Sequence, residues 1–429
     1  MTRVVLVGGG YVSIHAYAAL ARHLRRRISR GDVEVVVVTA DPCHRFHGFT
    51  GEVLAGILPI ERTRTPVTDA CPRARVVHAH VTRVDRERRT ITCEPVTGGP
   101  EVELRWDHLV VGTGSREPAS RVPGLAEHGF TLRGPGDIER LAARVDALRP
   151  GPTDPVPTVV VAGGGVAGVE LAAAVADRGQ GLVRVELVHS GPALVPELAA
   201  DQPRLARRVA AELDRLDVVV RAGTRLVEVT PTSALLSDGC VVVTTMVIGT
   251  IGQRPVPLPG LGAGLRDLQG RLTTAPDLSV VDGVWAAGDA ARVTHPATGD
   301  PVPANALWAI KAGRHVGVNV SRAVQGRRTR RFRYRGLGRA ASFGLGRSVS
   351  ELYGIPFTGW AAWFLRLVFF LRFMPSRRRA LATVADTVRA LGGRRVPVTA
   401  SVVGAAGSSA AGQVDVAVAI AVADGAAAA

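Results

Sequence analysis

The chain has 429 residues, 46% of them hydrophobic, and 49 glycines, which fits an α/β protein with two or three domains and substantial cores. Its formal net charge of +16 comes almost wholly from arginine, since Lys311 is the only lysine. This charge indicates an acidic partner such as phosphate groups or anionic lipid. The sequence has no Cys/His zinc spacing and no aromatic-rich basic motif, so we expect neither nucleic-acid binding nor a metal site.

The cysteines give no sign of a redox-active disulfide. Cys43, Cys71, Cys93 and Cys240 are far apart and form no C-x-x-C or C-x4-C pair. We therefore expect reduced thiols and a cytoplasmic location. The N-terminus leads straight into a predicted strand, with no basic segment before an apolar run, so we expect no signal peptide.

The first 39 residues predict a βαβ unit. Its parts are the strand Arg3–Val7, a helix over His15–Arg27 and the buried parallel strand Glu34–Thr39. Gly8, Gly9 and Gly10 form a glycine-rich turn whose backbone can approach a phosphate group. Ser13 stands where a third glycine is usual. Thr39 stands where an acidic residue usually binds ribose hydroxyls.

The stretch up to residue 157 predicts loops, a hairpin and a further buried strand. The segments are the loop Cys43–Pro59, the hairpin strands Val76–Val84 and Thr90–Pro95, the strand region Trp106–Ser115, the connection and helix Thr131–Leu148, and the linker Pro150–Pro157. Thr113 and Gly114 follow the buried strand, where the chain must cross close to a bound cofactor.

A second βαβ unit begins at Thr158–Leu171, TVVVAGGGVAGVEL. Gly163, Gly165 and Gly168 have the G-x-G-x-x-G spacing, which permits a tight turn, a close approach of backbone to pyrophosphate, and packing of helix on strand. The second strand, Leu182–Val188, ends in His189 rather than in an acid. Without an acidic residue at this position, a 2′-phosphate on the nucleotide would not be repelled, and His189 could even help to hold it. The alternative is that His189 is a simple surface histidine.

The next hundred residues complete the α/β pattern. Arg221–Leu236 and Cys240–Gly249 contain further strands, Gly249–Pro257 resembles the earlier VGTGSREPA, Val281–Ala291 is a strand that ends on Gly288 and Asp289, and Asn305–Gln325 is a helix. Asp289 follows its strand beside the start of a helix, a position that suits hydrogen bonding to a polyol hydroxyl.

The C-terminal third changes character. Gly359–Met374 is almost wholly apolar but only 16 residues long, with Arg366 and Arg372, which is short for a membrane span. It predicts a helix lying in a membrane interface, with Trp360 and Trp363 at headgroup level and the arginines snorkelling. The arginines of residues 377–379 and 389–395 add a polybasic patch suited to anionic lipid. The alternative is a core or dimer-interface helix, and residues 396–429 predict a low-complexity tail.

The ordered set of motifs resembles the two-dinucleotide-domain flavoproteins that bind FAD and NAD(P)H. It consists of a glycine turn, GTGS, a second glycine turn, GQRP and AAGDAA, over about residues 3–320. Within that family the chain is most similar to the type II NADH dehydrogenases, which are NADH:quinone oxidoreductases of membrane surfaces. FHGFTGEVLAG, GVAGVELA and the amphipathic region that begins with FRYRGLGRAASFGLGRS carry this resemblance.

The resemblance implies a role for each matching position. The FAD site would take Gly8, Gly9, Gly10, Ser13, Thr39, Val81, Thr113, Gly114, Gly252, Gly288, Asp289 and Leu307. The NAD(P)H site would take Gly163, Gly165, Val166, Gly168 and His189. Glu170 matches an acidic residue that the family places near the contact between nicotinamide and flavin.

One departure from the family concerns the helix after AAGDAA. Relatives carry three glutamines there, by the flavin and the quinone, and this chain has Leu307, Lys311 and Ala312. The departure puts the quinone site in doubt. One interpretation is that Lys311 brings positive charge near the isoalloxazine ring of the flavin. The alternative is that Lys311 only pairs with a nearby carboxylate.

The resemblance also implies a domain plan and a function. The plan is an FAD domain from residues 1–118 and 282–331, an NAD(P)H domain from 119–281, a membrane-docking or dimer region from 332–395, and the tail. The predicted enzyme passes hydride from NAD(P)H to flavin and then two electrons to an acceptor, most simply a quinone, on the inner face of the cell membrane. The alternatives are a reductase with an iron–sulfur protein or small-molecule acceptor, in which the apolar region makes a homodimer, and a flavin-bound redox sensor.

Overall fold

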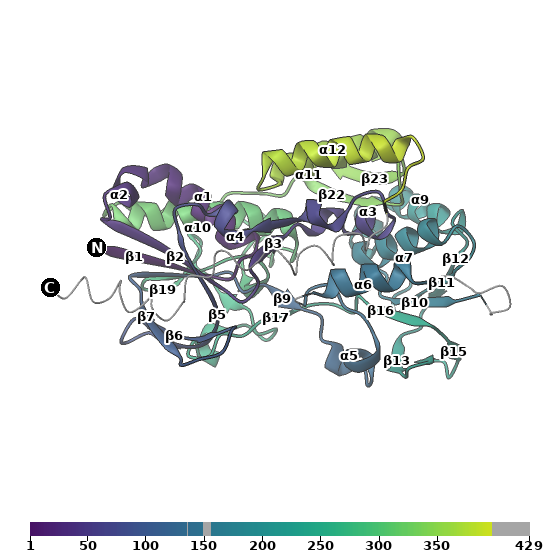
Figure 1. Ribbon diagram of the computed structural model, residues 1–429, viewed down its shortest axis with the longest axis horizontal. Coiled ribbons are helices and arrows are strands. Elements are labelled where there is room, and N and C mark those ends of the chain that lie inside the picture. Colours follow the sequence, from purple (N-terminus) through teal and green to yellow (C-terminus); the bar gives the residue numbers. More distant parts are fainter. Residues whose placement is uncertain (135, 149–155, 397–429) are drawn as a thin grey trace.

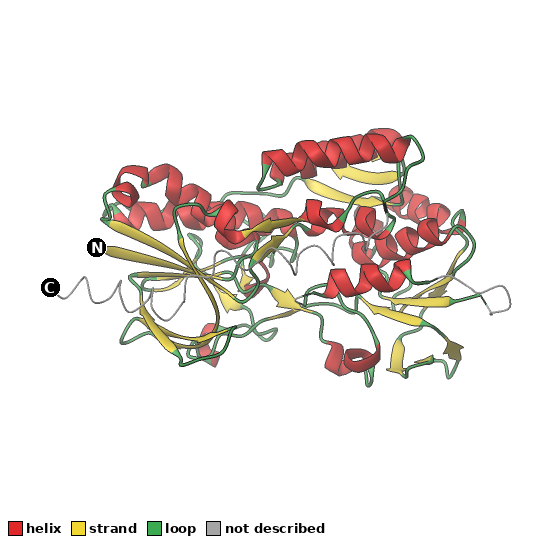
Figure 2. Ribbon diagram, viewed as in Figure 1, coloured by secondary structure: helices red, strands yellow, loops and turns green. Residues whose placement is uncertain are grey.

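The computed structural model describes residues 1–134, 136–148 and 156–396. Two sheet-and-helix domains lie side by side, and a smaller C-terminal layer lies over the second domain and the middle of the molecule, as Figure 1 shows. Helices and strands alternate through both domains (Figure 2), so the α/β prediction is confirmed.

The first domain is built on an eight-stranded sheet. In spatial order its strands are β19 (Ser279–Val281), β20 (Val284–Ala286), β8 (His108–Val111), β1 (Thr2–Val7), β2 (Val33–Thr39), β5 (Arg75–Asp85), β6 (Thr90–Pro95) and β7 (Val102–Arg105). The pairs from β20 to β5 are parallel, whereas β6 and β7 form an antiparallel extension. The central strands β8, β1 and β2 are runs of Val and Leu that are buried on both faces, as expected of parallel strands covered by helices.

Two helices pack closely against this sheet. They are α1 (Tyr11–His23), which the short α2 (Arg25–Ser29) follows, and α10 (Ala306–Val324). Gly313 and Gly317 of α10 lie against the backbone of α1, because a Cβ at Gly313 would come within 2.6 Å of the carbonyl oxygen of Val12. The helix predicted over Asn305–Gln325 is confirmed, with these two residues as its caps. The predicted start of the first helix at His15 was wrong, because helical backbone begins at Tyr11, directly after the extended residue Gly10.

The second domain holds a four-stranded parallel sheet. Its strands are β12 (Val218–Ala222), β11 (Arg184–His189), β10 (Thr158–Ala162) and β16 (Met246–Gly249). The surrounding elements are α5 (Leu125–His128), α6 (Asp137–Asp146), α7 (Val166–Gly179), α8 (Pro196–Asp201), α9 (Pro203–Asp214), β13 (Leu226–Val229), β14 (Ser233–Leu236) and β15 (Val241–Val243). The helix α7 continues directly from the second glycine turn, as the sequence predicts.

Several short elements lie outside the two main sheets. They are β3 (Cys43–Arg45), β4 (Arg64–Pro66), α3 (Thr50–Leu54), α4 (Val67–Ala70), β9 (Ser115–Arg116), β17 (Arg254–Pro255), β18 (Leu272–Thr273) and β21 (Ala291–Arg292). The pair β9–β17 is antiparallel and brings together the two segments that the sequence likened to each other. Chain segments that leave both sheets therefore meet at one junction.

The C-terminal layer is a three-stranded antiparallel sheet covered by two helices. Its elements are β22 (Gly338–Ser342), β23 (Ser348–Leu352), β24 (Ile355–Thr358), α11 (Gly359–Phe373) and α12 (Arg377–Leu391). Phe343, Val349 and Met374 share a core with α3 and α7, so this layer packs on the second domain and on the segment that contains α3. Within the described residues no helix is long and apolar enough to cross a membrane. Residues 397–429 of the predicted tail lie outside the described residues.

Candidate functional site

The first glycine turn leaves the beginning of α1 open. Gly8 has a φ of +100°, and a Cβ there would lie 2.5 Å from the carbonyl oxygen of Gly112 on the neighbouring loop. No atom of the residues that the structure describes lies within 4 Å of a Cβ placed on Gly10, which precedes α1 without a side-chain cap. The first N–H groups of α1 therefore face open space, and together with the helix dipole they suit a phosphate.

The second glycine turn repeats this arrangement. Gly163 has a φ of +126°, and a Cβ there would overlap Thr250 of the neighbouring loop, just as Gly8 meets Gly112. Gly165 precedes α7 without a side-chain cap and has nothing within 4 Å of a Cβ position. Gly168 lies against the carbonyl group of Gly163, so helix and turn pack closely. The chain thus carries two glycine turns of the same construction, at the carboxyl ends of β1 and β10.

The residue in place of the third glycine of the first turn is fully buried. Ser13 has an exposed fraction of 0%, and its hydroxyl has no hydrogen-bond partner within the described chain. A Cβ on Gly112 would lie 3.1 Å from this hydroxyl oxygen, so Ser13 packs closely against a residue that has no side chain. The structure thus explains why serine can replace glycine there.

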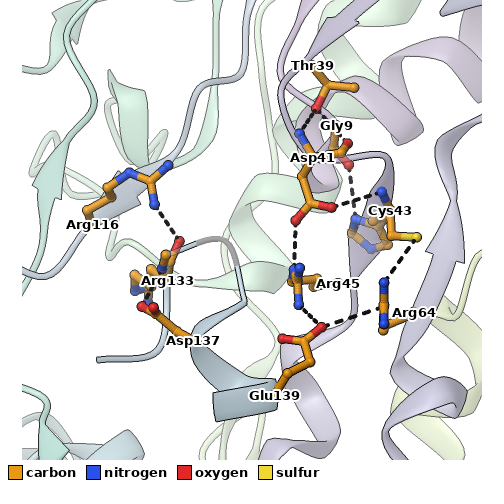
Figure 3. A network of polar contacts seen from close by, with 12 residues as sticks. Gly9, Thr39, Asp41, Cys43, Arg45, Arg64, Arg116, Arg133, Asp137 and Glu139 are labelled. Carbon is orange, nitrogen blue, oxygen red and sulfur yellow. Dashed lines mark hydrogen bonds and ion pairs between the residues drawn. The ribbon is translucent and has the colours of Figure 1, made fainter. Parts of the chain in front are cut away.

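The end of β2 belongs to a polar network that joins the two domains (Figure 3). The hydroxyl of Thr39 donates to the carbonyl oxygen of Asp41 (3.0 Å), and the Asp41 carboxylate accepts from Arg45 Nε (2.7 Å). The other side of the Arg45 guanidinium pairs with Glu139 of α6. The sequence placed Thr39 at this strand end but gave no sign of Arg45 or Glu139, because their pairing joins residues 94 positions apart.

His189 lies against the second glycine turn, as predicted for the residue at the end of β11. A Cβ on Gly164 would lie 2.8 Å from the Cβ of His189. The imidazole is 5% exposed, so the reading as a surface histidine was wrong. Burial lowers the pKa of His189, and the ring is therefore neutral at pH 7.

Asp289 lies at the junction between the domains. Its Oδ2 accepts from the hydroxyl of Ser115 (2.6 Å) and from Arg133 (3.1 Å). The Thr113 hydroxyl donates to the carbonyl oxygen of Val256 (3.0 Å), which ties the same loops together. Gly114 and Gly252 both have nothing within 4 Å of a Cβ position. The two segments that resemble each other thus line one open junction, and Arg133 is a member that the sequence did not indicate.

Other predicted positions lie further along the same elements. Val81 is half-buried in β5, where the strand leaves β2 and pairs with β6. Gly288 begins the turn that carries Asp289, close to Val12 of α1. Leu307 is half-buried in the first turn of α10, whose N-cap Asn305 accepts a hydrogen bond from the N–H of Trp308 (3.1 Å).

Three charged side chains meet in the interior where α3, α7 and α11 come together. Arg366 of α11 pairs with Glu52 of α3 and, at 3.1 Å, with Glu170 of α7. Glu170 also accepts from the backbone N–H of Ser342 in β22 (2.8 Å). Arg366 is only 4% exposed. The prediction that Arg366 snorkels to a lipid interface was therefore wrong, because the carboxylates of buried Glu52 and partly buried Glu170 hold its guanidinium inside the protein.

The charge of Glu170 depends on this cluster. Burial raises its pKa to about 7, against the opposing effect of Arg366, while Glu52 pushes it further up. One guanidinium facing two carboxylates leaves the cluster negative when both are ionised. Glu170 can therefore take up or release a proton near neutral pH.

Lys311 lies among aromatic rings. Its Nζ is 5.5 Å from the ring centre of Tyr334 and 5.4 Å from that of Phe373. Within the part of the chain that the structure describes, no carboxylate pairs with it, so the alternative of a simple ion pair is not supported. Burial, followed by Arg314 and Arg372, lowers the pKa of Lys311.

Aromatic side chains pack against one another between the first glycine turn and α11. Tyr11 contacts Phe46 at 5.8 Å between ring centres, and Phe370 contacts Phe46 at 5.9 Å and Phe49 at 5.4 Å. The Tyr11 hydroxyl accepts from the backbone N–H of His47 (3.0 Å). These rings come from three segments far apart in sequence and form an apolar wall beside the junction.

The outer surface of the C-terminal layer is apolar. Trp360, Phe364 and Val368 of α11 are 61%, 60% and 48% exposed at a helical spacing of four. On α12, Leu381, Val384 and Val388 are 73%, 39% and 62% exposed. We call these six residues the outer apolar face. Trp363, predicted at headgroup level, is only 7% exposed, so that placement was wrong because its side chain faces the core.

The predicted polybasic patch is divided between solvent and the protein. Arg377 and Arg378 are exposed at the start of α12. Arg379 donates to the carbonyl oxygen of Glu61 (2.7 Å), Arg389 pairs with Asp386, and Arg395 pairs with Asp177 at 2.9 Å. Part of this charge thus fastens α12 and the chain after it to the domains below.

The cysteines are as predicted. All four are free thiols, and Cys71 and Cys93 are buried, which raises the pKa of each to about 12. Cys43 is half-buried in β3. No group of three metal-ligating side chains occurs among the described residues.

Comparison with known proteins relates this arrangement to one family. The model of the pyridine nucleotide-disulphide oxidoreductases matches residues 2–313. An NADH dehydrogenase-like protein of Mycobacterium tuberculosis is 32% identical over 68% of this chain and 73% of its own length. The demethylphylloquinone reductase of Synechocystis is 27% identical over 86% and 92%. The structure of NDH2 from Plasmodium falciparum in complex with NADH has the same fold, with a TM-score of 0.79 at 13% identity, over 91% of this chain and 98% of that one.

Proposed function

Because the chain belongs to the family of the pyridine nucleotide-disulphide oxidoreductases, we propose that it is an FAD-dependent NAD(P)H dehydrogenase. In this proposal hydride passes from NAD(P)H to flavin, and two electrons then pass to an acceptor, for which we propose a membrane quinone. The observation that carries the proposal is the pair of open glycine turns at Gly10 and Gly165. Gly8 lies against Gly112 and Gly163 against Thr250, and the segments that follow these two loops pair with each other as β9 and β17. Residues 1–118 and 282–331 would form the FAD domain, residues 119–281 the NAD(P)H domain, and residues 332–395 the docking region.

The residues at the first turn fit FAD. The free N–H groups after Gly10 would bind its pyrophosphate, and Thr39 and Val81 lie along the edge where its adenosine would extend. Thr113, Gly114 and Asp289 would line the flavin and the ribityl chain. FAD, when bound, supplies the two-electron chemistry, so the protein needs no nucleophile and no metal.

The residues at the second turn fit a nicotinamide dinucleotide. Gly163, Gly165, Val166 and Gly168 would hold its pyrophosphate, and His189 would meet the adenosine ribose. A neutral His189 neither repels nor attracts a 2′-phosphate by charge. We therefore expect the chain to accept both NADH and NADPH.

Glu170 and Lys311 are the side chains for which we propose roles in turnover. Glu170 lies one helical turn after Gly165, and its ionisation near pH 7 would change the charge beside the nicotinamide. Lys311 would offer positive charge from α10, where relatives carry a glutamine. The tyrosine and phenylalanine around its ammonium group leave it without a competing carboxylate among the described residues.

The outer apolar face supports a membrane location. An apolar strip rimmed by Arg372, Arg377 and Arg378 is the pattern of a helix pair that lies in an anionic interface. We propose that this face rests on the inner surface of the cell membrane, so that a lipid-soluble quinone can reach the protein. Vesicle flotation with and without anionic lipid, followed by NADH oxidation with a short-chain quinone, tests this step.

A soluble acceptor is the second candidate, and the replacement of the family's glutamines by Leu307, Lys311 and Ala312 favours it. A small iron–sulfur protein or a small molecule would then take the electrons. In that case the outer apolar face would be covered by a second copy of the chain. Turnover with a soluble one-electron acceptor but not with quinone, together with a dimer in gel filtration, would select this candidate.

A further inference from the structure

A second charged surface follows α10, and its arginines have no role in the proposed function. The segment from Arg327 to Arg335 follows α10 and contains six arginines in nine residues. We call it the basic strap. It carries the chain back along α10 toward the C-terminal layer (Figure 1).

The strap alternates between inward aromatic and outward basic side chains. Phe332 is buried, with its ring 5.3 Å from that of His315, and the Tyr334 ring lies 4.7 Å from that of Trp308. Arg331 and the other odd-numbered arginines of this stretch are exposed. The aromatic residues hold the strap on α10, and the guanidinium groups are presented to solvent.

A buried asparagine fixes the backbone of the strap. Asn319 of α10 has an exposed fraction of 0%. Its Nδ2 donates to the carbonyl oxygen of Arg330 (2.8 Å), and its Oδ1 accepts from the N–H of Arg330 (3.0 Å). His315 Nε2 lies 2.7 Å from the same carbonyl oxygen, and the Phe332 N–H donates to the carbonyl oxygen of Pro276 (2.7 Å). The arginines are thus displayed from a fixed framework, which lowers the entropy lost when they bind a ligand.

The fixed strap and α10 enclose a groove of about 540 Å³. Its lining consists of His315, Val318, Arg330, Arg331 and Arg333. Among the described residues none of these three arginines has a carboxylate partner. The carboxylate of Asp277 accepts from Ser279 (2.7 Å) and from Thr329 (2.7 Å), so it is already engaged.

The positive charges of these arginines repel each other, so their gathering in one groove does not stabilise the fold. Guanidinium groups bind phosphate oxygens through paired, charge-assisted hydrogen bonds. We propose that this groove is a binding site for a phosphate-bearing anion. The shared chemistry is a phosphate group, either on a soluble molecule or on a lipid headgroup.

A neighbouring set of arginines offers a matched control. Arg25 and Arg26 of α2 are exposed, and α2 lies beside the C-terminal end of α10, because Arg27 donates to the carbonyl oxygen of Val324 (2.8 Å). Neither residue lines the groove. Removing two charges there changes the net charge of the protein as much as removing Arg331 and Arg333.

The test is calorimetric titration of the FAD-loaded protein with inorganic pyrophosphate, with saturating NAD⁺ to fill the second turn. We expect saturable binding at one site. The double variant R331Q/R333Q should weaken it by about tenfold or more, as the loss of two charge-assisted contacts implies. R25Q/R26Q should change it by less than about threefold, through long-range electrostatics alone. Thermal unfolding and flavin content of both variants should match the parent protein, since these side chains are exposed.

Vesicles of phosphatidylcholine with and without phosphatidylglycerol distinguish the two sources of phosphate. If R331Q/R333Q floats with the anionic vesicles less than R25Q/R26Q does, the ligand is a lipid headgroup. If the two variants float equally but only the groove variant loses pyrophosphate binding, the ligand is a soluble phosphate compound. Absence of saturable pyrophosphate binding, or equal weakening by both variants, would overturn the proposal. Both readouts are independent of NAD(P)H oxidation, so failure of the proposed function is separately visible.

Discussion

The guanidinium of Arg366 lies 3.1 Å from the carboxylate of Glu170, and this buried contact joins the C-terminal layer to the helix that begins at the second glycine turn. Arg366 also holds Glu52 of α3, so one side chain connects α3, α7 and α11. The C-terminal layer is therefore part of the proposed active site. Removing it by truncation would expose Glu170 and break the core it shares with the domains.

Replacing Arg366 by methionine should destabilise the protein strongly. The variant R366M leaves buried Glu52 and partly buried Glu170 without their cation, and breaking a buried ion pair costs about 3–5 kcal/mol in comparable cases. Denaturant unfolding measures it, and R366K should recover part of the loss. The control R372M alters an exposed arginine of the same helix and should stay within about 0.5 kcal/mol. Equal stability of R366M and R372M would contradict the buried pairing.

Glu170 should make flavin reduction depend on pH. Its raised pKa of about 7 means that the folded protein holds a proton below pH 7 that an ordinary carboxyl group loses near its usual pKa of 4.5. The contribution of Glu170 to stability therefore falls as pH rises from about 4.5 to 7. An ionised Glu170 also opposes the arrival of further negative charge, so we expect the reduction rate to fall as pH rises through 7.

Stopped-flow measurement of that rate against pH tests the assignment. In E170Q the rate of flavin reduction should no longer fall as pH rises through 7, because an amide does not titrate. R366K should keep this pH-dependent step, because the neighbouring positive charge remains. A step of unchanged position and size in E170Q would show that another group titrates.

The outer apolar face should bind vesicles. The double variant F364S/V388S removes two exposed apolar side chains from α11 and α12 and should lower flotation with anionic vesicles by about tenfold, since each buried CH₂ group contributes about 0.8 kcal/mol. V241S/V243S, on an exposed strand of the second domain, is the matched control and should float like the parent. If both variants float like the parent and gel filtration of F364S/V388S shows loss of a dimer, the face is an interface between copies of the chain.

His189 should control the choice between NADH and NADPH. In H189E a carboxylate at the end of β11 can accept from the ribose 2′-hydroxyl and repel a 2′-phosphate. The ratio of kcat/KM for NADH to that for NADPH should rise by about tenfold or more, the size of one charged hydrogen bond. H189Q provides the uncharged control and should leave the ratio within about threefold. An unchanged ratio in H189E would place the adenosine ribose elsewhere.

Local patterns were sufficient to predict the parts of the site that are local in sequence. Each glycine turn, the strand before it and the helix after it lie within about 20 residues, so the spacing of Gly163, Gly165 and Gly168 carries the geometry. The start of α1 could not be predicted in this way, because the Tyr11–Ser13 stretch has no strong helix propensity. The helix begins where it does because of the extended conformation of Gly10.

The buried charges could not be predicted in the same way. Arg366 lies 314 residues from Glu52 and 196 from Glu170. A lone arginine in an apolar helix is compatible with a lipid interface and with a buried ion pair, and only the packing of α11 on α3 and α7 decides between them. The two tryptophans of α11 could not be told apart from the sequence either. Trp363 faces inward, whereas Trp360, three residues before it, faces outward.

The measurement that tests the central claim most directly is an anaerobic titration of the purified protein with NADH, followed by the visible absorption of flavin. The claim is that two phosphate-binding turns, at Gly10 and Gly165, bring a nicotinamide against a flavin. We predict a yellow protein whose absorption is bleached by one equivalent of NADH. A protein that stays colourless after incubation with excess FAD, or a yellow protein that NADH does not bleach, would contradict the claim.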